Sequence, residues 1–176
     1  MMAVMSSDLG HLLRTIIIGN AGSGKSRLAE RITSAAAVPA IDLDHIHWEG
    51  CGYGSRRDED TARGLVAEAS ERPAWVIEGV YGWLARIALP RATALIWLDL
   101  SWEECRDGLV DRGLRRGMTL SDQSELVAWV SEYWTRDNAN SYAGHLRLYE
   151  SFGGYKLRLK SRSEADAFEV AAQGKR

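Results

Sequence analysis

Short apolar runs alternate along the chain with stretches in which apolar residues recur every three or four positions. The apolar runs are rich in β-branched and aromatic residues, which is typical of strands buried in a parallel sheet. They occupy residues 14–18, 40–43, 74–77, 92–98 and 155–159. Helical spacing or capping residues mark residues 27–32, 58–71, 101–116, 126–134 and 163–172. The alternation predicts an α/β fold with a five-stranded parallel sheet.

A complete phosphate-loop pattern separates the first predicted strand from the first predicted helix. Residues 19–26 read Gly-Asn-Ala-Gly-Ser-Gly-Lys-Ser and match G-x-x-x-x-G-K-[ST] without a mismatch. In this position the loop amides and the helix N-terminus point at an anion, which an ordinary glycine-rich turn does not achieve. We expect nucleotide to be bound by Gly19, Asn20, Ala21, Gly22, Ser23, Gly24, Lys25, Ser26 and Arg27. The sequence therefore predicts ATP and Mg²⁺ as ligands, with Lys25 on the β- and γ-phosphates and the Ser26 hydroxyl on Mg²⁺.

Acidic residues follow two of the predicted strands at the edge where such sheets bind ligands. Asp42 and Asp44 would lie on one side of the second strand, and we expect Asp42 to serve the metal through water and Asp44 to serve an acceptor hydroxyl. The alternative is that Asp44 caps a turn and Asp42 is a solvated strand end. Glu78 ends the third strand and is our second catalytic acid. Asp99, which ends the fourth strand, is its rival for the role of the acid near Mg²⁺.

Arginines gather at the end of the predicted helix over 101–116. Arg112, Arg115 and Arg116 lie beside Gly113 and Gly117, so residues 112–122 form a candidate lid whose guanidinium groups would fold over the triphosphate. The alternative is that these arginines only complement the dipole at the helix C-terminus.

A glycine-rich stretch, residues 45–57, is predicted to be an open loop carrying an acceptor pocket. Trp48, together with His45, His47 and Tyr53, could stack on a ring of the acceptor. The two histidines lack an evident third metal ligand, so we treat them as pocket or surface residues.

Composition sets limits on the remaining possibilities. The 176 residues suggest one domain, residues 1–176, with residues 1–13 expected to be frayed. A net charge of −2 gives no support for binding nucleic acid, and no segment reads as a signal peptide or a membrane span. Cys51 and Cys105 fit no metal spacing and predict reduced thiols in the cytoplasm. No guanine-reading Asn-Lys-x-Asp segment is present, which argues against a GTPase.

Two functions remain after these exclusions. The first is an ATP- and Mg²⁺-dependent kinase acting on a small acceptor, such as a nucleoside or a nucleotide. The second is a nucleotide-dependent regulatory or binding protein with little turnover. The sequence does not indicate an oligomeric state.

Four segments together resemble the adenylate-kinase-like phosphate-loop proteins of the bacterial "DNA topology modulation protein" family. They are GNAGSGKS, DLDHIHW, WVIEGVYGWL and LIWLDLSWEECRDGLVDRGLRRG, and they span roughly residues 14–117. The resemblance implies a nucleoside-monophosphate-kinase-like fold with strand order 2-3-1-4-5, ATP binding, and an adenine site near Lys160 and Ser161. The chain departs from the family's Glu-Gly-Asn-Tyr at Val80, and from its Pro-Gly-Trp at residues 49–53. Both departures fall in the expected acceptor pocket and leave the substrate open.

Overall fold

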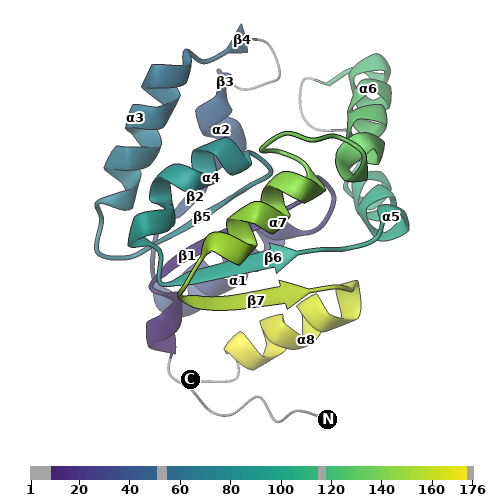
Figure 1. Ribbon diagram of the computed structural model, residues 1–176. Coiled ribbons are helices and arrows are strands. Elements are labelled where there is room, and N and C mark those ends of the chain that lie inside the picture. The colour runs from purple at the N-terminus through teal and green to yellow at the C-terminus, as the bar shows by residue number, and fades with distance from the viewer. Residues whose placement is uncertain (1–8, 51–54, 115–117, 174–176) are drawn as a thin grey trace.

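A five-stranded parallel sheet forms the centre of the protein in a computed structural model that describes residues 9–50, 55–114 and 118–173. Its strand order is β2–β5–β1–β6–β7 (Figure 1). The strands are β1 (Arg14–Gly19), β2 (Ala40–Asp42), β5 (Trp75–Gly79), β6 (Ala94–Leu98) and β7 (Tyr155–Leu159). Counted over the five strands predicted from the sequence, this order is 2-3-1-4-5, as expected.

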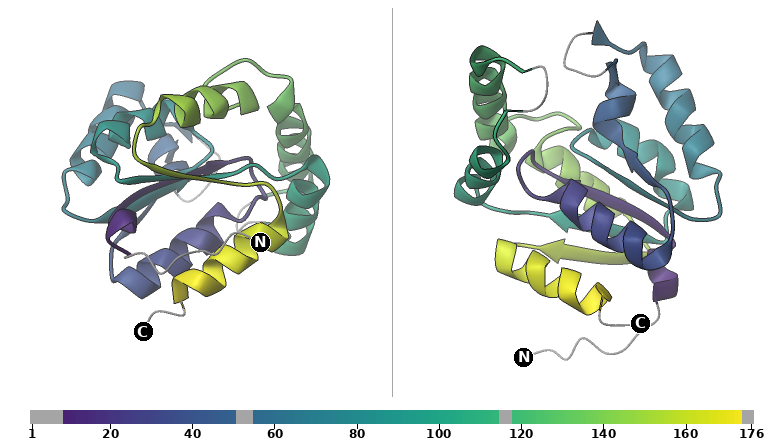
Figure 2. Two further views of the ribbon diagram at one scale, coloured as in Figure 1. Left: turned by 60° about the horizontal axis from the view of Figure 1, so that its bottom comes forward. Right: turned by 180° about the vertical axis from the view of Figure 1, so that it is seen from behind.

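Helices cover both faces of the sheet, as the view along the layers shows (Figure 2). On one face lie α1 (Lys25–Ala36) and α8 (Arg162–Gln173), and on the other α3 (Glu59–Ser70), α4 (Gly82–Ala88) and α7 (Tyr142–Ser151). Two further helices, α5 (Trp102–Arg112) and α6 (Leu120–Ser131), lie beyond the carboxyl end of β6 (Figure 1). Short 3-10 turns are formed by η1 (Leu9–Leu12), η2 (Leu89–Arg91) and η3 (Glu132–Trp134).

The central strands are buried on both faces, which explains why the sequence shows continuous apolar runs rather than alternation. Every residue of β5 and β6 is buried. Ile16 and Trp97 pack toward α4 and α7, whereas Ile17 and Ile96 pack toward α1. Two apolar layers therefore fix the sheet, and its carboxyl edge is left to carry polar side chains.

The segment after β2 differs from the prediction. Residues Leu43–His47 form a short helix, α2, followed by the strands β3 (Trp48–Glu49) and β4 (Ser55–Arg56), which pair antiparallel outside the main sheet. The cause is local: the Asp42 carboxylate accepts a hydrogen bond from the Asp44 amide at 2.8 Å and caps α2. The placement of Asp42 and Asp44 on one side of a strand is therefore wrong, and the open loop predicted over residues 45–57 is wrong where α2 forms.

Several element boundaries also shift. Helix α5 ends at Arg112 rather than near Arg116, because Gly113 takes a φ of 68° as its C-cap. Residues 115–117 lie outside the described part of the chain. Leu9–Leu12 forms η1 with Leu12 buried, so these four residues are not frayed as expected. Among the described residues, none of the helices has the length and apolar composition needed to cross a bilayer.

Candidate active site

The phosphate loop connects β1 to α1 and has the backbone that its glycines predict. Gly22 and Gly24 have φ values of 79° and 96°, a region that side chains with a Cβ rarely adopt. A Cβ on Gly22 would also overlap the backbone carbonyl of Cys105 in α5. Helix α1 receives no side-chain cap at its N-terminus, so its first amides are left for an anion.

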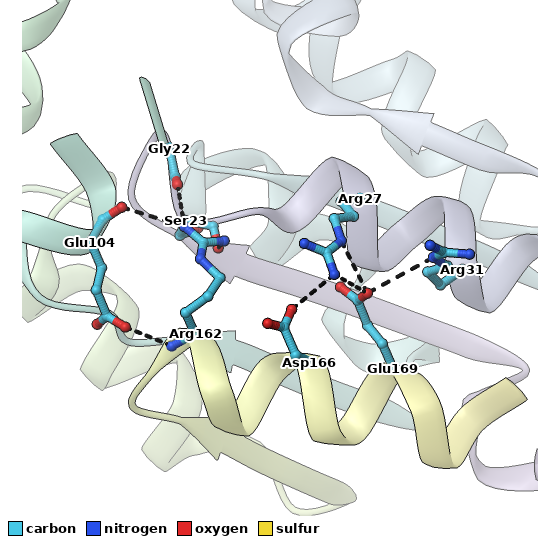
Figure 3. A network of polar contacts seen from close by, with 8 residues as sticks. All are labelled: Gly22, Ser23, Arg27, Arg31, Glu104, Arg162, Asp166 and Glu169. Atoms are coloured by element: carbon cyan, nitrogen blue, oxygen red, sulfur yellow. Dashed lines mark hydrogen bonds and ion pairs between the residues drawn. The ribbon is translucent and has the colours of Figure 1, made fainter. Parts of the chain in front are cut away.

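Arg162, the first residue of α8, fixes the loop from behind (Figure 3). Its guanidinium donates to the carbonyl oxygens of Ser23 at 2.8 Å and Gly22 at 3.0 Å. Its backbone amide donates to the Glu104 carboxylate at 2.7 Å, which joins α5 to α8. Sequence reasoning missed Arg162; the available signal was a basic residue three positions after the last strand, at the ligand-binding edge of the sheet.

Lys25 lies almost fully buried under the loop. Its Nζ donates to the Asn20 carbonyl oxygen at 2.8 Å, and the Asn20 side-chain amide donates to the Val130 carbonyl oxygen of α6 at 3.0 Å. Burial lowers the pKa of Lys25, and the nearby Glu78 carboxylate acts in the opposite direction. The ammonium group is therefore held in a site where an added anion would be strongly attracted.

Glu78, at the end of β5, contacts the loop serine directly. The Ser26 hydroxyl donates to Glu78 Oε1 at 2.6 Å. Burial raises the pKa of Glu78, and the Lys25 ammonium opposes that rise. Asp99 is instead bound by Arg158 at 2.7 Å and lies outside the lining of the cavity beside the loop. Of the two rival acids, Glu78 is the one in contact with the phosphate loop.

A cavity of about 760 Å³ opens beside the loop, and we call it the nucleotide cavity. Its lining combines the loop, the ends of β5 and α2, and one face of α5. The lining residues are Ala21, Gly22, Gly24, Lys25, Ser26, Arg27, Asp44, Glu78, Gly79, Val80, Glu104, Asp107, Gly108, Asp111, Arg112 and Arg162.

The predicted phosphate-binding arginines have different positions in the structure. Arg27 lines the nucleotide cavity, but its guanidinium pairs with Asp166 at 2.9 Å and Glu169 at 3.0 Å of α8 (Figure 3). Arg112, the last residue of α5, also lines this cavity. Arg115 and Arg116 lie outside the described residues.

A second cavity of about 540 Å³ adjoins the first, and we call it the acceptor pocket. Both cavities are lined by Ala21, Asp44 and Val80, so Asp44 lies where they meet. The acceptor pocket is lined by Ala21, Asp44, His47, Trp48, Arg56, Val80, Tyr81, Met118, Asp122, Glu125, Leu126, Trp129 and Asn140. Asp42 lines neither cavity, since its side chain caps α2.

Aromatic side chains form one wall of this pocket. His47 stacks on Tyr81 with ring centroids 4.0 Å apart, and Trp48 Nε1 donates to the Tyr81 hydroxyl at 3.0 Å. Burial lowers the pKa of His47. Of the other residues expected here, His45 points into solvent with 82% of its side chain exposed, and Tyr53 lies outside the described residues.

A network of buried hydrogen bonds lies beneath the pocket and was not predicted from the sequence. Its members are His145, Tyr133 and Trp97. His145 Nε2 lies 2.9 Å from the Val80 carbonyl oxygen, which can only accept, so Nε2 carries the proton. Nδ1 then accepts from the Tyr133 hydroxyl at 2.7 Å, and Trp97 Nε1 donates to that hydroxyl at 3.3 Å. This hydrogen-bonded network therefore fixes the backbone carbonyl of Val80, a residue that borders both cavities.

The residues present fit a nucleotide that carries its own Mg²⁺. In the described part of the chain, no three histidine, cysteine or carboxylate side chains gather into a metal site. Mg²⁺ in kinases is usually held by few protein groups together with phosphates and water, and Ser26 with Glu78 offers such a pair.

Comparison with solved structures identifies the fold. A gluconokinase from Sinorhizobium meliloti 1021 superimposes with a TM-score of 0.57 at 17% identity, covering 93% of this chain and 92% of that one. A shikimate kinase from Bacteroides thetaiotaomicron gives 0.59 at 17% identity over 92% and 96%. A shikimate kinase from Acinetobacter baumannii, in complex with shikimate, gives 0.52 at 15% identity over 93% of both chains.

The sequence comparisons are negative. No protein-family model matches the chain, and no curated protein matches it. The specific resemblance to the topology modulation family is therefore not confirmed. What the structural neighbours establish is the fold, which this chain shares with the gluconokinase and the shikimate kinase.

Proposed function

We propose that the protein is a phosphotransferase that moves the γ-phosphoryl group of ATP to a hydroxyl group of a small acceptor. The observation that carries this proposal is the junction of two cavities at Asp44. One cavity is bordered by a complete phosphate loop, and the other has an aromatic wall suited to a small organic molecule. The fold shared with gluconokinase and shikimate kinases supports the same reaction class.

The nucleotide cavity would hold the triphosphate through groups already in place. The loop amides and the α1 N-terminus would face the phosphates, and Lys25 would supply a buried positive charge. Ser26 and Glu78 would hold Mg²⁺, which when bound neutralises charge on the β- and γ-phosphates. Arg112 reaches the same cavity from the end of α5 and would stabilise the transferring group, with Arg115 and Arg116 assigned the same task. We assign Lys160 and Ser161 to the border of the adenine.

Asp44 is the residue that would act on the acceptor. As the acceptor oxygen bonds to the γ-phosphorus, the bond from phosphorus to the β–γ bridging oxygen breaks and ADP leaves. The proton of the acceptor hydroxyl passes to the Asp44 carboxylate. Asp42 would assist Mg²⁺ through water, because it pairs in register with Glu78, although one of its carboxylate oxygens caps α2.

A nucleotide-dependent binding protein with little turnover is the competing function. Such a protein would have its acceptor pocket filled by its own side chains. The open volume of about 540 Å³ beside Asp44 favours the transferase instead.

The test is phosphoryl transfer from ATP to a panel of nucleosides, nucleotides and small alcohols, with an Asp44→Asn variant in parallel. Asn keeps the side-chain shape but cannot take the proton, so we expect transfer to fall by about 100-fold or more while the Kd for Mg·ATP stays nearly unchanged. Asp60→Asn, on the exposed side of α3, is the matched control and should match the wild type. No Mg·ATP binding by the wild type in calorimetry, or undiminished transfer by Asp44→Asn, would refute the proposal.

A further inference from the structure

The acceptor pocket carries information about its ligand that the proposed reaction does not use. Its two walls come from distant parts of the chain. One wall is aromatic and consists of His47, Trp48 and Tyr81. The other is one face of α6, which lies opposite α2 and β3 across the carboxyl edge of the sheet (Figures 1 and 2).

The α6 wall is both acidic and apolar. Asp122, Glu125, Leu126 and Trp129 follow helical spacing and all line the pocket. Asp122 also closes the capping box of α6, because its carboxylate accepts from the Thr119 amide at 2.7 Å. These hydrogen bonds lower the pKa of Asp122, so its negative charge is held in place at the pocket.

Charge in the pocket is negative among the described lining residues. Asp44, Asp122 and Glu125 supply three carboxylates, and Arg56 is the one cationic side chain. The pocket histidine, His47, is kept neutral near pH 7 because burial lowers its pKa. Sites for carboxylates or phosphates normally use the paired donors of arginine, so this balance disfavours an anionic acceptor.

The aromatic rings of the pocket favour an acceptor that carries a positive charge. The Arg136 guanidinium lies 4.1 Å from the ring centroid of Trp129, so one face of this ring already holds a cation. Aromatic faces beside carboxylates are the usual means by which proteins bind an organic ammonium group. An acceptor that matched both walls would combine an apolar or ring-shaped body with a positive charge.

We propose that the acceptor is a hydroxylated amine, whose hydroxyl reaches Asp44, whose body packs on Trp48 and Tyr81, and whose ammonium group lies beside Asp122 and Glu125. This rests on the proposed function and narrows it to one substrate class. The hydroxyl oxygen is the atom phosphorylated, and the amine stays protonated and only binds.

The experiment compares acceptors of one shape and different charge. The first series is glucosamine, glucose, glucuronate and glucose 6-phosphate. The second is 2-amino-1-phenylethanol, 1-phenylethanol and mandelate. Binding is followed by tryptophan fluorescence without nucleotide, and phosphoryl transfer is followed separately with Mg·ATP. In at least one series we expect the amine to bind about 5-fold or more tightly than the neutral compound, and the anions to bind most weakly.

Glu125→Gln provides the internal test, because Asp122 is also needed to cap α6. The substitution should remove most of the amine's advantage over the neutral compound and leave Mg·ATP binding unchanged. Glu150→Gln, an exposed carboxylate on α7 that lines neither cavity, should retain the full advantage.

The outcomes separate this inference from the proposed function. Preferred binding or transfer of an anion, equal binding of amine and neutral compounds, an unaffected preference in Glu125→Gln, or no binding of any amine would each overturn the inference. If amines bind with the expected preference but Mg·ATP does not bind, the transferase proposal fails and the assignment of the pocket stands.

Discussion

Two buried ionisable groups of opposite charge, Lys25 and Glu78, face the same cavity. Each loses hydration, which lowers the pKa of the lysine and raises that of the glutamate. Each also stabilises the charge of the other across the site. A triphosphate with its Mg²⁺ would bring an anion to Lys25 and a cation to Glu78.

Lys25→Ala tests the proposed contact between the Lys25 ammonium group and the phosphates of ATP. Losing the ammonium removes a charge-assisted hydrogen bond to phosphate, so the Kd for Mg·ATP should rise by about 10- to 100-fold. Calorimetric titration measures it, with circular dichroism to verify folding. Lys156→Ala, which removes an ammonium bonded to Tyr149 and Phe152 far from both cavities, should bind as the wild type does. Unchanged affinity in Lys25→Ala would exclude the assigned role.

His145 predicts a distinct pH dependence of stability. Burial lowers its pKa from 6.5 to about 3, so the folded protein keeps it neutral while the unfolded chain takes up a proton below pH 6.5. Stability from this residue is therefore present above pH 6.5 and is lost as the pH falls toward 3. Between about pH 7.5 and pH 5.5 the wild type should lose about 1.4 kcal/mol that His145→Gln does not lose.

Urea unfolding of the two proteins at both pH values measures this difference. Tyr133→Phe is the companion variant: it leaves His145 Nδ1 without its donor and should cost about 1–3 kcal/mol, yet it keeps the buried imidazole and so the pH dependence. A destabilisation by His145→Gln that is equal at both pH values would contradict the neutral, buried state of this histidine.

Residue by residue, the sequence predicted contacts that are local along the chain. The phosphate loop follows from its own eight residues, because its glycines and the next helix fix the backbone. Arg162 and His145 could not be found this way, since their partners lie 140 and 65 residues away. The backbone that follows Asp42 was mispredicted because a strand end and a helix cap use the same residue type, and only the backbone after it distinguishes the two.

At the scale of elements, the site depends on how closely α5 packs against the phosphate loop. Gly108 of α5 lies so close to the Gly22 carbonyl oxygen that a Cβ there would overlap it. The close packing places the acidic and basic side chains of α5 along the nucleotide cavity. Glycine in this helix therefore serves packing, at the expense of helix propensity.

The same substitution in two helices should have opposite effects. Gly108→Ala should destabilise the protein by about 1–3 kcal/mol and weaken Mg·ATP binding, because the new methyl group displaces the loop. Gly64→Ala in α3, where a Cβ meets nothing within 4 Å, should stabilise by about 0.5–1 kcal/mol through helix propensity. Denaturant unfolding measures both, and a stabilising Gly108→Ala would show that the loop does not depend on this contact.

Helices and strands were predicted correctly where a single sequence pattern identified them. The strands buried on both faces and the capping box of Ser101 with Glu104 are visible in the sequence, and the structure contains them. Helices α4 and α7 were missed because their apolar residues merge with flanking loops, and their packing uses Gly82 and Gly144 against the backbone of Ala139. Such long-range backbone contacts leave no periodic pattern.

At the scale of the molecule, the acceptor pocket exists only because α2 and α6 rise from the carboxyl edge of the sheet and line opposite sides of this pocket. The sheet order places the phosphate loop and the end of β5 side by side, since β1 pairs with β5. The fold class and strand order were predictable from strand spacing and family resemblance. The opposing α6 wall was not, because nothing near Trp48 in the sequence indicates it.

The segment 112–122 joins α5 to α6 and remains our candidate for a lid. Arg112 lines the nucleotide cavity, while Met118 and Asp122 line the acceptor pocket, so the described ends of this segment border both cavities. Closing it would exclude water from the γ-phosphate, which a kinase must protect from hydrolysis. The rival interpretation is a rigid connection whose arginines are surface charge.

Hydrogen exchange with and without a non-hydrolysable ATP analogue distinguishes the two interpretations. A lid predicts that amides of residues 112–122 become protected when the analogue binds, because ordering of the segment suppresses the local opening that exchange requires. The variant with Arg112, Arg115 and Arg116 all changed to alanine should bind the analogue without that protection, since its guanidinium groups no longer hold the phosphates. Helix α3, which lines neither cavity, serves as the reference within the same molecule. Protection confined to residues 19–26 in the wild type would mean that the segment does not close, and that Arg112 acts from a fixed position at the end of α5.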